Sequence, residues 1–301
     1  MSKKIVVGSR GSTLAMTQTE SVVAMIKEAN PGIDVSISRI VTRGDRNHHV
    51  PLEQVAGQGI FVKELEEALL DGRIDLAVHS LKDMPGQLPD GLCLSAVAER
   101  SDPRDVLISK GEKLAEMAPG ARIGTGSLRR AAQLTNWRPD LEACSIRGNV
   151  DTRLSKVANG ELDGVILAAA ALKRLDWEDR VSEYLSVEIF LPAVGQGALA
   201  IETRSDDKEI AGIVAPLNHL PTWQSITAER AFLRTLGGGC QSPIAALGTV
   251  GGTTLRLEGM VIEVTENQIF CSIEEGSVSS AEELGVRLAQ RLLAEGADKF
   301  I

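Results

Sequence analysis

Aromatic residues are scarce in this sequence: Phe, Trp and Tyr together make up 3% of its 301 residues. Proteins that bind single-stranded nucleic acid stack bases on aromatic rings, so this scarcity argues against that class. Positive charge is also in deficit, because 32 Lys and Arg residues face 41 Asp and Glu residues, which gives a net charge of −9. A general binder of nucleic acid or of anionic membranes carries the opposite balance. The composition therefore favours neither kind of partner.

Long apolar runs are absent as well. The longest ones, such as residues 165–172, are far shorter than the roughly 18 residues that a membrane-spanning helix needs. At the N-terminus the apolar stretch covers only residues 5–7 and ends at a glycine, which is too short for the core of a signal peptide. We therefore expect a cytoplasmic protein with no membrane partner.

The motifs of several common metal and cofactor sites are missing too. Four cysteines, at positions 93, 144, 240 and 271, lie too far apart for a CxxC metal site, and each is expected to be a free thiol. No set of His, Cys and Asp has the spacing of a zinc site or a catalytic triad, so no metal is expected. Neither GxGxxG at the first strand nor GxxxxGK[ST] occurs, which argues against nicotinamide cofactors and P-loop nucleotides.

The pattern that is present is an alternation of short β-branched runs with helical segments, which is typical of parallel α/β units. Strands are expected near residues 4–8, 35–42, 75–80, 92–98, 106–109, 122–125, 141–147, 163–169 and 197–203. Helices are expected near residues 13–29, 60–70, 127–137, 149–158 and 206–214. The predicted fold class is α/β: two doubly wound domains resembling the type II periplasmic binding proteins. In such a layout ligands bind in the cleft, at the carboxyl ends of the strands.

A change of pattern near residue 219 marks a third domain. A helix that ends at three glycines is followed by strands near residues 243–250, 254–264 and 268–275 and by a final helix, which together predict a small α+β domain. The expected domains are residues 1–98 with 197–215, residues 103–191, and residues 219–301. Residues 43–58 show no periodicity and are expected to form a mobile loop.

Arginine is concentrated in one part of the chain. Residues 121–153 contain six Arg, no Lys and three acidic residues, so this stretch has a charge of +3 within a chain of net charge −9. The planar guanidinium group pairs bidentately with carboxylates and phosphates, which a run of lysines does not do. The stretch therefore favours a ligand with several negative charges.

Three arginine-bearing segments also open predicted helices, at Arg10 to Ser12, at Ser127 to Arg130, and at Arg147 to Asn149. Free backbone N–H groups at a helix start, together with hydroxyls and Arg, can form an anion site. The alternative is that Ser12, Ser127 and Asn149 are ordinary N-caps and that the arginines are solvated. For any one segment the two interpretations are equal, whereas the three together favour a polyanionic ligand.

Two further features could carry chemistry. Lys82 and Asp83 follow a predicted strand that points into the same cleft, where a carboxylate could move protons or stabilise a developing cation. Taken alone, a surface ion pair before a turn explains them better. Cys240 follows three glycines that leave its thiol accessible for a covalent bond, and a chance cysteine in a turn is an equal alternative.

Together these segments resemble the hydroxymethylbilane synthase family, also called the porphobilinogen deaminases, over essentially the whole chain. The matching motifs are Val41-Thr42-Arg43-Gly44-Asp45, Phe61-Val62-Lys63-Glu64-Leu65-Glu66, His79-Ser80-Leu81-Lys82-Asp83, Ser127-Leu128-Arg129-Arg130, Arg147-Gly148-Asn149-Val150, Leu191-Pro192-Ala193-Val194-Gly195-Gln196-Gly197 and Gly238-Gly239-Cys240-Gln241. An ordered set of this length is highly specific.

The resemblance implies a transferase that joins four porphobilinogen molecules head to tail, releases ammonia at each step and frees hydroxymethylbilane. It implies a dipyrromethane cofactor attached through Cys240, with Asp83 as the catalytic carboxylate. The positions that match cofactor-binding residues of the family are Ser80, Lys82, Asp83, Thr125, Ser127, Arg129, Arg130, Arg147 and Gly148. The positions that match substrate-binding residues are Arg10, Ser12, Arg147, Arg153, Arg174 and Gln196.

The sequence departs from the family pattern in its loop, where Gln54 and Gln58 replace two usual lysines, and at Gly126, where a serine is common. The resemblance also implies a monomer and a transient hand-over of the product to uroporphyrinogen III synthase. Two rival classes are a solute-binding protein of the periplasmic type and a regulatory effector-binding domain. The first leaves Cys240 and the third domain unexplained, and the second lacks a helix-turn-helix segment.

Overall fold

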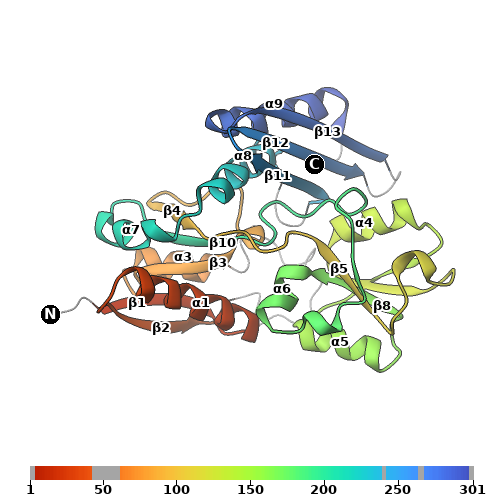
Figure 1. The fold of residues 1–301 in the computed structure, drawn as a ribbon, viewed down its shortest axis with the longest axis horizontal. Coiled ribbons are helices and arrows are strands. Elements are labelled where there is room, and N and C mark those ends of the chain that lie inside the picture. Colours follow the sequence, from red (N-terminus) through yellow and green to blue (C-terminus); the bar gives the residue numbers. More distant parts are fainter. Residues whose placement is uncertain (1–3, 43–61, 239–241, 264–267, 298–301) are drawn as a thin grey trace.

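A computed structural model describes residues 4–42, 62–238, 242–263 and 268–297. The chain forms three lobes, each with its own β-sheet (Figure 1). The N-terminal lobe, coloured red, orange and teal, lies beside the green and yellow second lobe, and the blue C-terminal lobe lies above both in this view. The predicted α/β class with a small α+β addition is confirmed.

The first lobe contains a five-stranded sheet of order β2-β1-β3-β10-β4. Its strands are β1 (Lys4–Arg10), β2 (Asp34–Ile40), β3 (Leu76–Ser80), β4 (Leu92–Val97) and β10 (Leu199–Arg204). Helices α1 (Thr13–Ala29) and α7 (Lys208–Val214) cover one face through an apolar cluster that includes Ile5, Val22 and Ile210. The other face packs against α3 (Lys63–Leu70), with Leu65 and Ala77 in contact.

The second lobe contains another five-stranded sheet, of order β7-β6-β8-β5-β9. Its strands are β5 (Asp105–Ser109), β6 (Arg122–Thr125), β7 (Glu142–Ser145), β8 (Gly164–Ala168) and β9 (Glu183–Tyr184). Helices α5 (Val150–Ala158) and α6 (Ala169–Arg174) pack in one cluster around Val165, and α4 (Leu128–Trp137) packs in a second around Ile123. Because helices cover both faces of this sheet, a site can form only at the ends of its strands.

Both sheets are mixed, which differs from the parallel units expected from the sequence. Strand β10 runs antiparallel to β3 and β4, and β5 runs antiparallel to β8. A parallel neighbour needs a long crossover, usually a helix, in its own lobe. Strands β5 and β10 instead follow the two segments in which the chain crosses from the other lobe, residues 98–104 (the first crossing) and 185–198 (the second crossing). That constraint therefore does not act on them. The short elements α6 and β9 were also not predicted, because six and two residues carry little periodicity.

The third lobe has the antiparallel sheet β11-β12-β13, with strands β11 (Ile244–Gly251), β12 (Thr254–Glu263) and β13 (Gln268–Ser277). Helices α8 (Leu220–Leu236) and α9 (Ala281–Ala294) pack on it and on each other. Gly285 of α9 lies against the carbonyl oxygen of Ala228, which a Cβ atom would overlap, so glycine permits this close helix contact. As expected, α8 ends at a glycine, Gly237, in the left-handed region with φ of 75°.

One buried carboxylate ties the third lobe to both segments that cross between the first two lobes. Glu229 of α8 is fully buried and accepts a hydrogen bond of 2.5 Å from Arg100 Nη1, in the first crossing segment. It also accepts bonds from the backbone N–H of Gly195, in the second crossing, and of Gly248, in β11. The junction beside the site is therefore fixed by charge-assisted hydrogen bonds rather than by apolar packing alone.

Candidate active site

Asp83 lies where the carboxyl ends of β1 and β3 meet. Strand β3 leads directly into a short 3₁₀ turn, Leu81–Asp83, which carries Lys82 and Asp83. Strands β1 and β3 are parallel, so Arg10 at the end of β1 comes close, with 3.9 Å between its Nη1 and Asp83 Oδ2. The Asp83 side chain is 33% exposed, so a ligand can reach it.

Lys82 turns toward the second lobe. Its Nζ donates a hydrogen bond of 3.1 Å to Oε1 of Gln196, in the second crossing. Burial, and then the nearby charge of Arg130, lower the pKa of Lys82 to about 8, although Asp83 acts in the opposite direction. Lys82 is therefore a cation at neutral pH that is held next to other cations. An anionic ligand would relieve that repulsion.

Arg129 and Arg130, at the start of α4, are buried and share one carboxylate. Arg129 Nη2 and Arg130 Nη2 lie 2.8 and 2.7 Å from the two oxygens of Asp105. Burial alone would raise the pKa of Asp105, but the charges of both arginines and bonds from Arg130 and Gln196 hold it well below its usual value. Arg129 also donates to the carbonyl of Leu191. The alternative that these two arginines are solvated is wrong.

Gln196 connects this cluster to the first lobe. Its side-chain nitrogen donates to Asp105 and to the carbonyl of Pro103, both at 2.7 Å. Its oxygen accepts from Lys82 and, at 3.3 Å, from Arg130. A single amide in the crossing segment thus brings together side chains from both α/β lobes.

Arg153, on α5, adds to the group of cations formed by Arg10, Lys82, Arg129 and Arg130, which we call the positive wall. Its Nε donates to the carbonyl of Gly148, whose φ of 109° brings it close to α5. Burial, followed by the charges of Arg130 and Arg147, lowers the pKa of Arg153 to about 10, while Asp83 acts in the opposite direction. The sequence-predicted residues Asp83, Arg130 and Arg147 therefore all lie within electrostatic reach of Arg153.

The remaining predicted residues occupy the ends of elements around this wall. Ser80 ends β3, and Thr125 ends β6 and accepts a hydrogen bond from the backbone N–H of Ser127. Arg174, the last residue of α6, donates to the carbonyl of Gly197 at 2.7 Å, and burial lowers its pKa to about 10. Arg174 is thus held at the second crossing.

The capping interpretation of the helix starts is confirmed. Ser12 accepts from the backbone N–H of Ala15, Ser127 from that of Arg130, and Asn149 from that of Thr152. Capping fixes the directions of α1, α4 and α5, and these helices carry or follow the arginines. The capping and anion-binding interpretations therefore do not compete at these positions.

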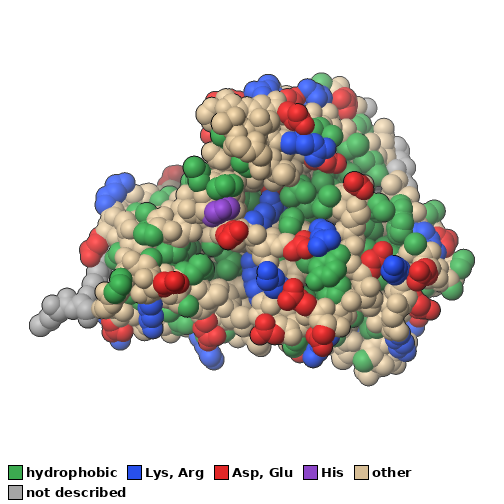
Figure 2. Space-filling model, viewed as in Figure 1, with side chains coloured by type: hydrophobic (Ala, Val, Ile, Leu, Met, Phe, Trp, Pro, Cys, Tyr) green, Lys and Arg blue, Asp and Glu red, His purple; other side chains and the backbone are tan. Residues whose placement is uncertain are grey.

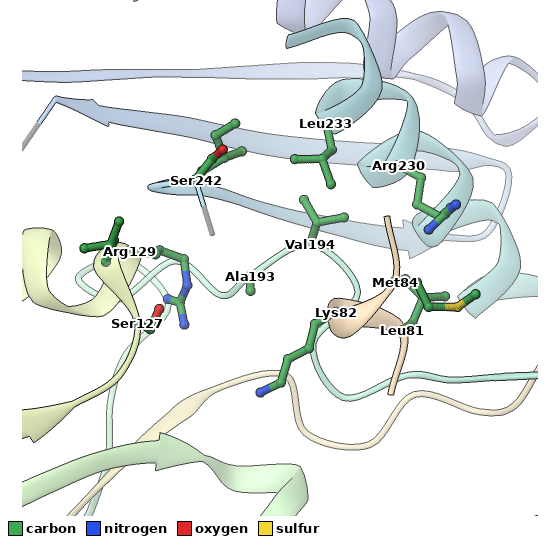
Figure 3. A pocket seen from close by; sticks show the side chains of 12 residues that line it. Leu81, Lys82, Met84, Ser127, Arg129, Ala193, Val194, Arg230, Leu233 and Ser242 are labelled. Atoms are coloured by element: carbon green, nitrogen blue, oxygen red, sulfur yellow. The ribbon is translucent and has the colours of Figure 1, made fainter. Parts of the chain in front are cut away.

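A cavity at the junction of the three lobes lies beside this cluster (Figure 3). Its apolar lining includes Leu81, Met84, Val194, Leu233 and Ile244, and its polar lining is Lys82, Ser127, Arg129, Arg230 and Ser242. In Figure 3, Arg129 and Ser127 lie on one side and Arg230 on the other, with Lys82 below. Figure 2 shows positive and negative side chains mixed on the face of the molecule that Figure 1 presents.

One atom of this cavity wall lacks a partner. The Nε of Arg129 is buried and has no hydrogen-bond partner among the residues that the structure describes. A buried N–H group without a partner costs free energy, and a bound carboxylate would remove that cost. Cys240 and the loop 43–58, with Gln54 and Gln58, lie outside the described residues. Ser242, two positions after Cys240, lines the cavity.

Two residues of the site were not predicted from the sequence. Asp105 pairs with Arg129 and Arg130 but lies outside the arginine-rich stretch that drew attention to them. Arg230, on α8, lines the cavity and donates to the carbonyl of Gly86, and burial lowers its pKa to about 10. Its signal in the sequence is a charge on the face of α8 that otherwise carries Ile226 and Leu233.

Fold and site together define an α/β protein whose interlobe cleft is lined with buried cations and suits a ligand bearing several carboxylates. A family model described as the dipyromethane cofactor binding domain of porphobilinogen deaminase matches residues 5–212, and one for the C-terminal domain of porphobilinogen deaminase matches residues 223–294. The chain belongs to the porphobilinogen deaminase family.

Curated relatives agree with these family models. The porphobilinogen deaminase of Syntrophotalea carbinolica is 49% identical over 98% of this chain and 94% of its own length. Those of Geobacter metallireducens and Brevibacillus brevis are each 50% identical over 99% and 97% of this chain, and 94% of their own lengths. The chain is thus a transferase of tetrapyrrole biosynthesis that forms hydroxymethylbilane and uses a dipyrromethane cofactor.

Solved structures with lower similarity include a transporter binding protein and a periplasmic domain. A probable amino-acid ABC transporter extracellular-binding protein, ytmK from Bacillus subtilis, has a TM-score of 0.45 and 11% identity, and the match covers 72% of this chain and 90% of that one. The Bordetella pertussis BvgS periplasmic VFT2 domain has a TM-score of 0.41 and 15% identity, and the match covers 70% of this chain and 84% of that one. Within the described residues, no helix is long and apolar enough to cross a membrane.

Proposed function

We propose that Asp83 is the catalytic carboxylate of porphobilinogen condensation. At each coupling, a bond forms between the aminomethyl carbon of porphobilinogen and the free α-carbon of the terminal pyrrole, and the C–N bond to ammonia breaks. Asp83 accepts the proton that the α-carbon loses, and its negative charge stabilises the positive charge that develops as ammonia leaves. Its position supports this role, because it is partly exposed and lies among Arg10, Lys82 and Arg153.

The residues lining the cavity fit the dipyrromethane cofactor. When bound, this group supplies the pyrrole carbon to which the first porphobilinogen is joined. Its carboxylates would be held by Lys82, Ser127 and Arg129 of the lining and, outside that lining, by Ser80, Thr125, Arg130, Arg147 and the backbone of Gly148. Cys240 would form the thioether. The observation that supports this assignment most directly is the buried Nε of Arg129, which has no hydrogen-bond partner among the described residues. Arg129 and Lys82 both line the cavity.

The incoming substrate and the growing chain would be bound by Arg10, Ser12, Arg147, Arg153, Arg174 and Gln196. These residues lie on both α/β lobes, and each porphobilinogen brings two carboxylates. Guanidinium groups suit them because they pair bidentately with carboxylates. Since Asp105 already neutralises part of the charge of Arg129 and Arg130, Arg10 and Arg153 would bear more of the substrate's charge.

The domain boundaries are proposed as residues 1–98 with 197–215, residues 103–191 and residues 219–301. The three separate sheets and the apolar clusters that cover them support this division. We also propose a cytoplasmic monomer that passes its product to uroporphyrinogen III synthase. The bacterial relatives and the absence of a long apolar helix in the described part of the chain support the cytoplasmic location.

The role of Lys82 can be tested through its pKa. Replacing Lys82 with Met should lower kcat/KM for porphobilinogen about ten- to a hundredfold at pH 7, since a charge-assisted hydrogen bond of about 1.5–3 kcal/mol is lost. Because the wild-type amine is charged below and neutral above its pKa of about 8, the difference should shrink by pH 9.

The matched control is Lys110→Met, which removes an exposed lysine after β5. This control should leave kcat/KM at the wild-type value from pH 7 to pH 9. A Lys82→Met defect of equal size at both pH values would contradict a charge-based role for Lys82.

A further inference from the structure

Three ionisable side chains lie inside the first lobe, behind the Ser80–Asp83 segment. His79 of β3 and Glu202 of β10 are buried, with 2.9 Å between Nε2 and Oε2. Glu66 of α3 is also buried and faces the same region. The catalytic scheme above uses none of these three residues, which we call the buried acid cluster.

The register of the sheet explains why the cluster forms. In the antiparallel pairing of β3 with β10, Ala200 lies opposite His79 and Glu202 opposite Ala77. Residues two apart share a face of a strand, so His79 and Glu202 lie on the same face. Ala77 packs on α3, which shows that α3 covers this face and brings Glu66 to it.

The surroundings of the cluster are apolar. One neighbouring core group contains Val62, Ala200 and Ile226, and another contains Leu65 and Ala77. In that setting, Oε1 of Glu66 and Oε1 of Glu202 are both buried without a hydrogen-bond partner among the described residues. Two carboxylates in an apolar core, each with one buried oxygen that lacks a partner, are costly when both are ionised, and one proton between them removes most of that cost.

The charged groups around Glu66 come from several elements. Glu202 of β10 acts on it with like charge and His79 of β3 with opposite charge, and Glu67 and Lys63 act from its own helix. Arg230 of α8 lies near enough to Glu202 to interact with its charge. Burial and then Glu202 raise the pKa of Glu66 to about 7. Glu66 thus holds a proton up to near neutral pH.

We propose that the buried acid cluster of Glu66, His79 and Glu202 holds a proton and positions the Ser80–Asp83 segment for catalysis. His79 directly precedes this segment, so its hydrogen bond to Glu202 fixes the end of β3. A proton on Glu66 keeps Glu202 as the partner of His79. When Glu66 loses the proton, repulsion displaces Glu202 and loosens the end of β3. These three are positioning residues, and their effect on the reaction rests on the proposed role of Asp83.

The direction of the effect on stability follows from the raised pKa. A carboxyl whose folded pKa exceeds its unfolded value stabilises the fold most at low pH, and that stability is lost as pH rises from about 4.5 to about 7. Glu66→Gln keeps the shape of the protonated acid and cannot ionise. The Tm of this variant minus that of the wild type should therefore grow by about 5 °C between pH 5 and pH 8.

The test compares Glu66→Gln with the wild-type holoenzyme. The ratio of the variant's kcat to the wild-type kcat should rise about three- to tenfold from pH 6 to pH 8.5, with little change in the ratio of KM values, because positioning affects the chemical step. Lys82 also titrates in this pH range, but it is present in both proteins, so its effect on kcat cancels in the ratio. The control Glu67→Gln, an exposed neighbour on α3, should show no trend in Tm difference or kcat ratio.

An infrared measurement on the wild type keeps the test independent of the variant's folding. The carbonyl band of a protonated carboxyl should be present at pH 6 and absent at pH 8.5. Absence of this band at pH 6 would overturn the proposal that the buried acid cluster holds a proton. Tm and kcat differences that do not depend on pH would overturn it as well. A Tm difference that grows while the kcat ratio stays flat would overturn the positioning role. The infrared and Tm measurements need no substrate, so they stand even if Asp83 has another role.

Discussion

Replacing Asp83 with Asn is expected to lower kcat by about 10²–10⁴-fold, the usual contribution of a positioned general acid or base. Asparagine keeps the size of the side chain but cannot take up the proton released at each coupling. Asp83 is one third exposed and its contact with Arg10 is 3.9 Å long, so the fold should not depend on this charge. Formation of hydroxymethylbilane by the cofactor-loaded variant measures the effect.

The control for this variant is Asp90→Asn, which removes an exposed carboxylate seven positions further along the same lobe. It should retain wild-type kcat. If the cofactor-loaded Asp83→Asn enzyme also turned over porphobilinogen within a few-fold of the wild type, Asp83 would not be the catalytic carboxylate. Arg10 and Lys82 would then still serve as anion-binding residues.

Asp105→Asn is expected to have the largest effect on stability, lowering the free energy of unfolding by about 3–5 kcal/mol at pH 7. Asp105 is fully buried between Arg129 and Arg130 and also accepts from Gln196. Without its charge, two guanidinium groups remain buried and uncompensated. Denaturant unfolding of the two proteins, at equal cofactor content, measures the difference.

The control for Asp105 is Asp102→Asn, three positions earlier. Asp102 also pairs with an arginine, Arg104, but both side chains are partly exposed, at 28% and 42%. An exposed pair contributes about 0–1 kcal/mol, so this variant should unfold almost like the wild type. Equal losses in the two variants would show that the buried cluster contributes no more than a surface ion pair.

The pH dependence of the Asp105 effect has a defined sign. The pKa of Asp105 is held below its usual value, so its contribution to stability is present above the unfolded pKa and is lost as pH falls through the folded one. The difference between wild type and Asp105→Asn should therefore be full at neutral pH and should shrink below about pH 4. This is the opposite direction to that predicted for Glu66.

Elements of the fold that depend on local sequence could be predicted from it. Helix α1 spans Thr13–Ala29, the interval that its apolar periodicity indicates, and Ser12 caps it as its residue type suggests. Gly237 ends α8 because glycine readily adopts the left-handed conformation there. The directions of β5 and β10 could not be predicted in this way, since they depend on where the two crossings enter each sheet.

The same distinction applies to the site. The position of Lys82 and Asp83 at a strand end was predictable, and their proposed roles come from the family resemblance. The pairing of Arg129 with Asp105 was not, because the two residues are 24 positions apart and meet only when the second lobe folds. Glu66 likewise follows a helical pattern in which an acidic residue suggests solvent, and only the packing of α3 on β3 and β10 shows that it is buried.

We propose that the cavity of buried cations holds a dipyrromethane attached to Cys240. The most direct test is the intact mass of the denatured protein beside that of a Cys240→Ser variant prepared in the same way, with Cys271→Ser as the matched control. The wild type and Cys271→Ser should exceed their sequence masses by one dipyrromethane, and Cys240→Ser should not. Bare sequence masses for all three proteins, even after incubation with porphobilinogen or hydroxymethylbilane, would contradict it.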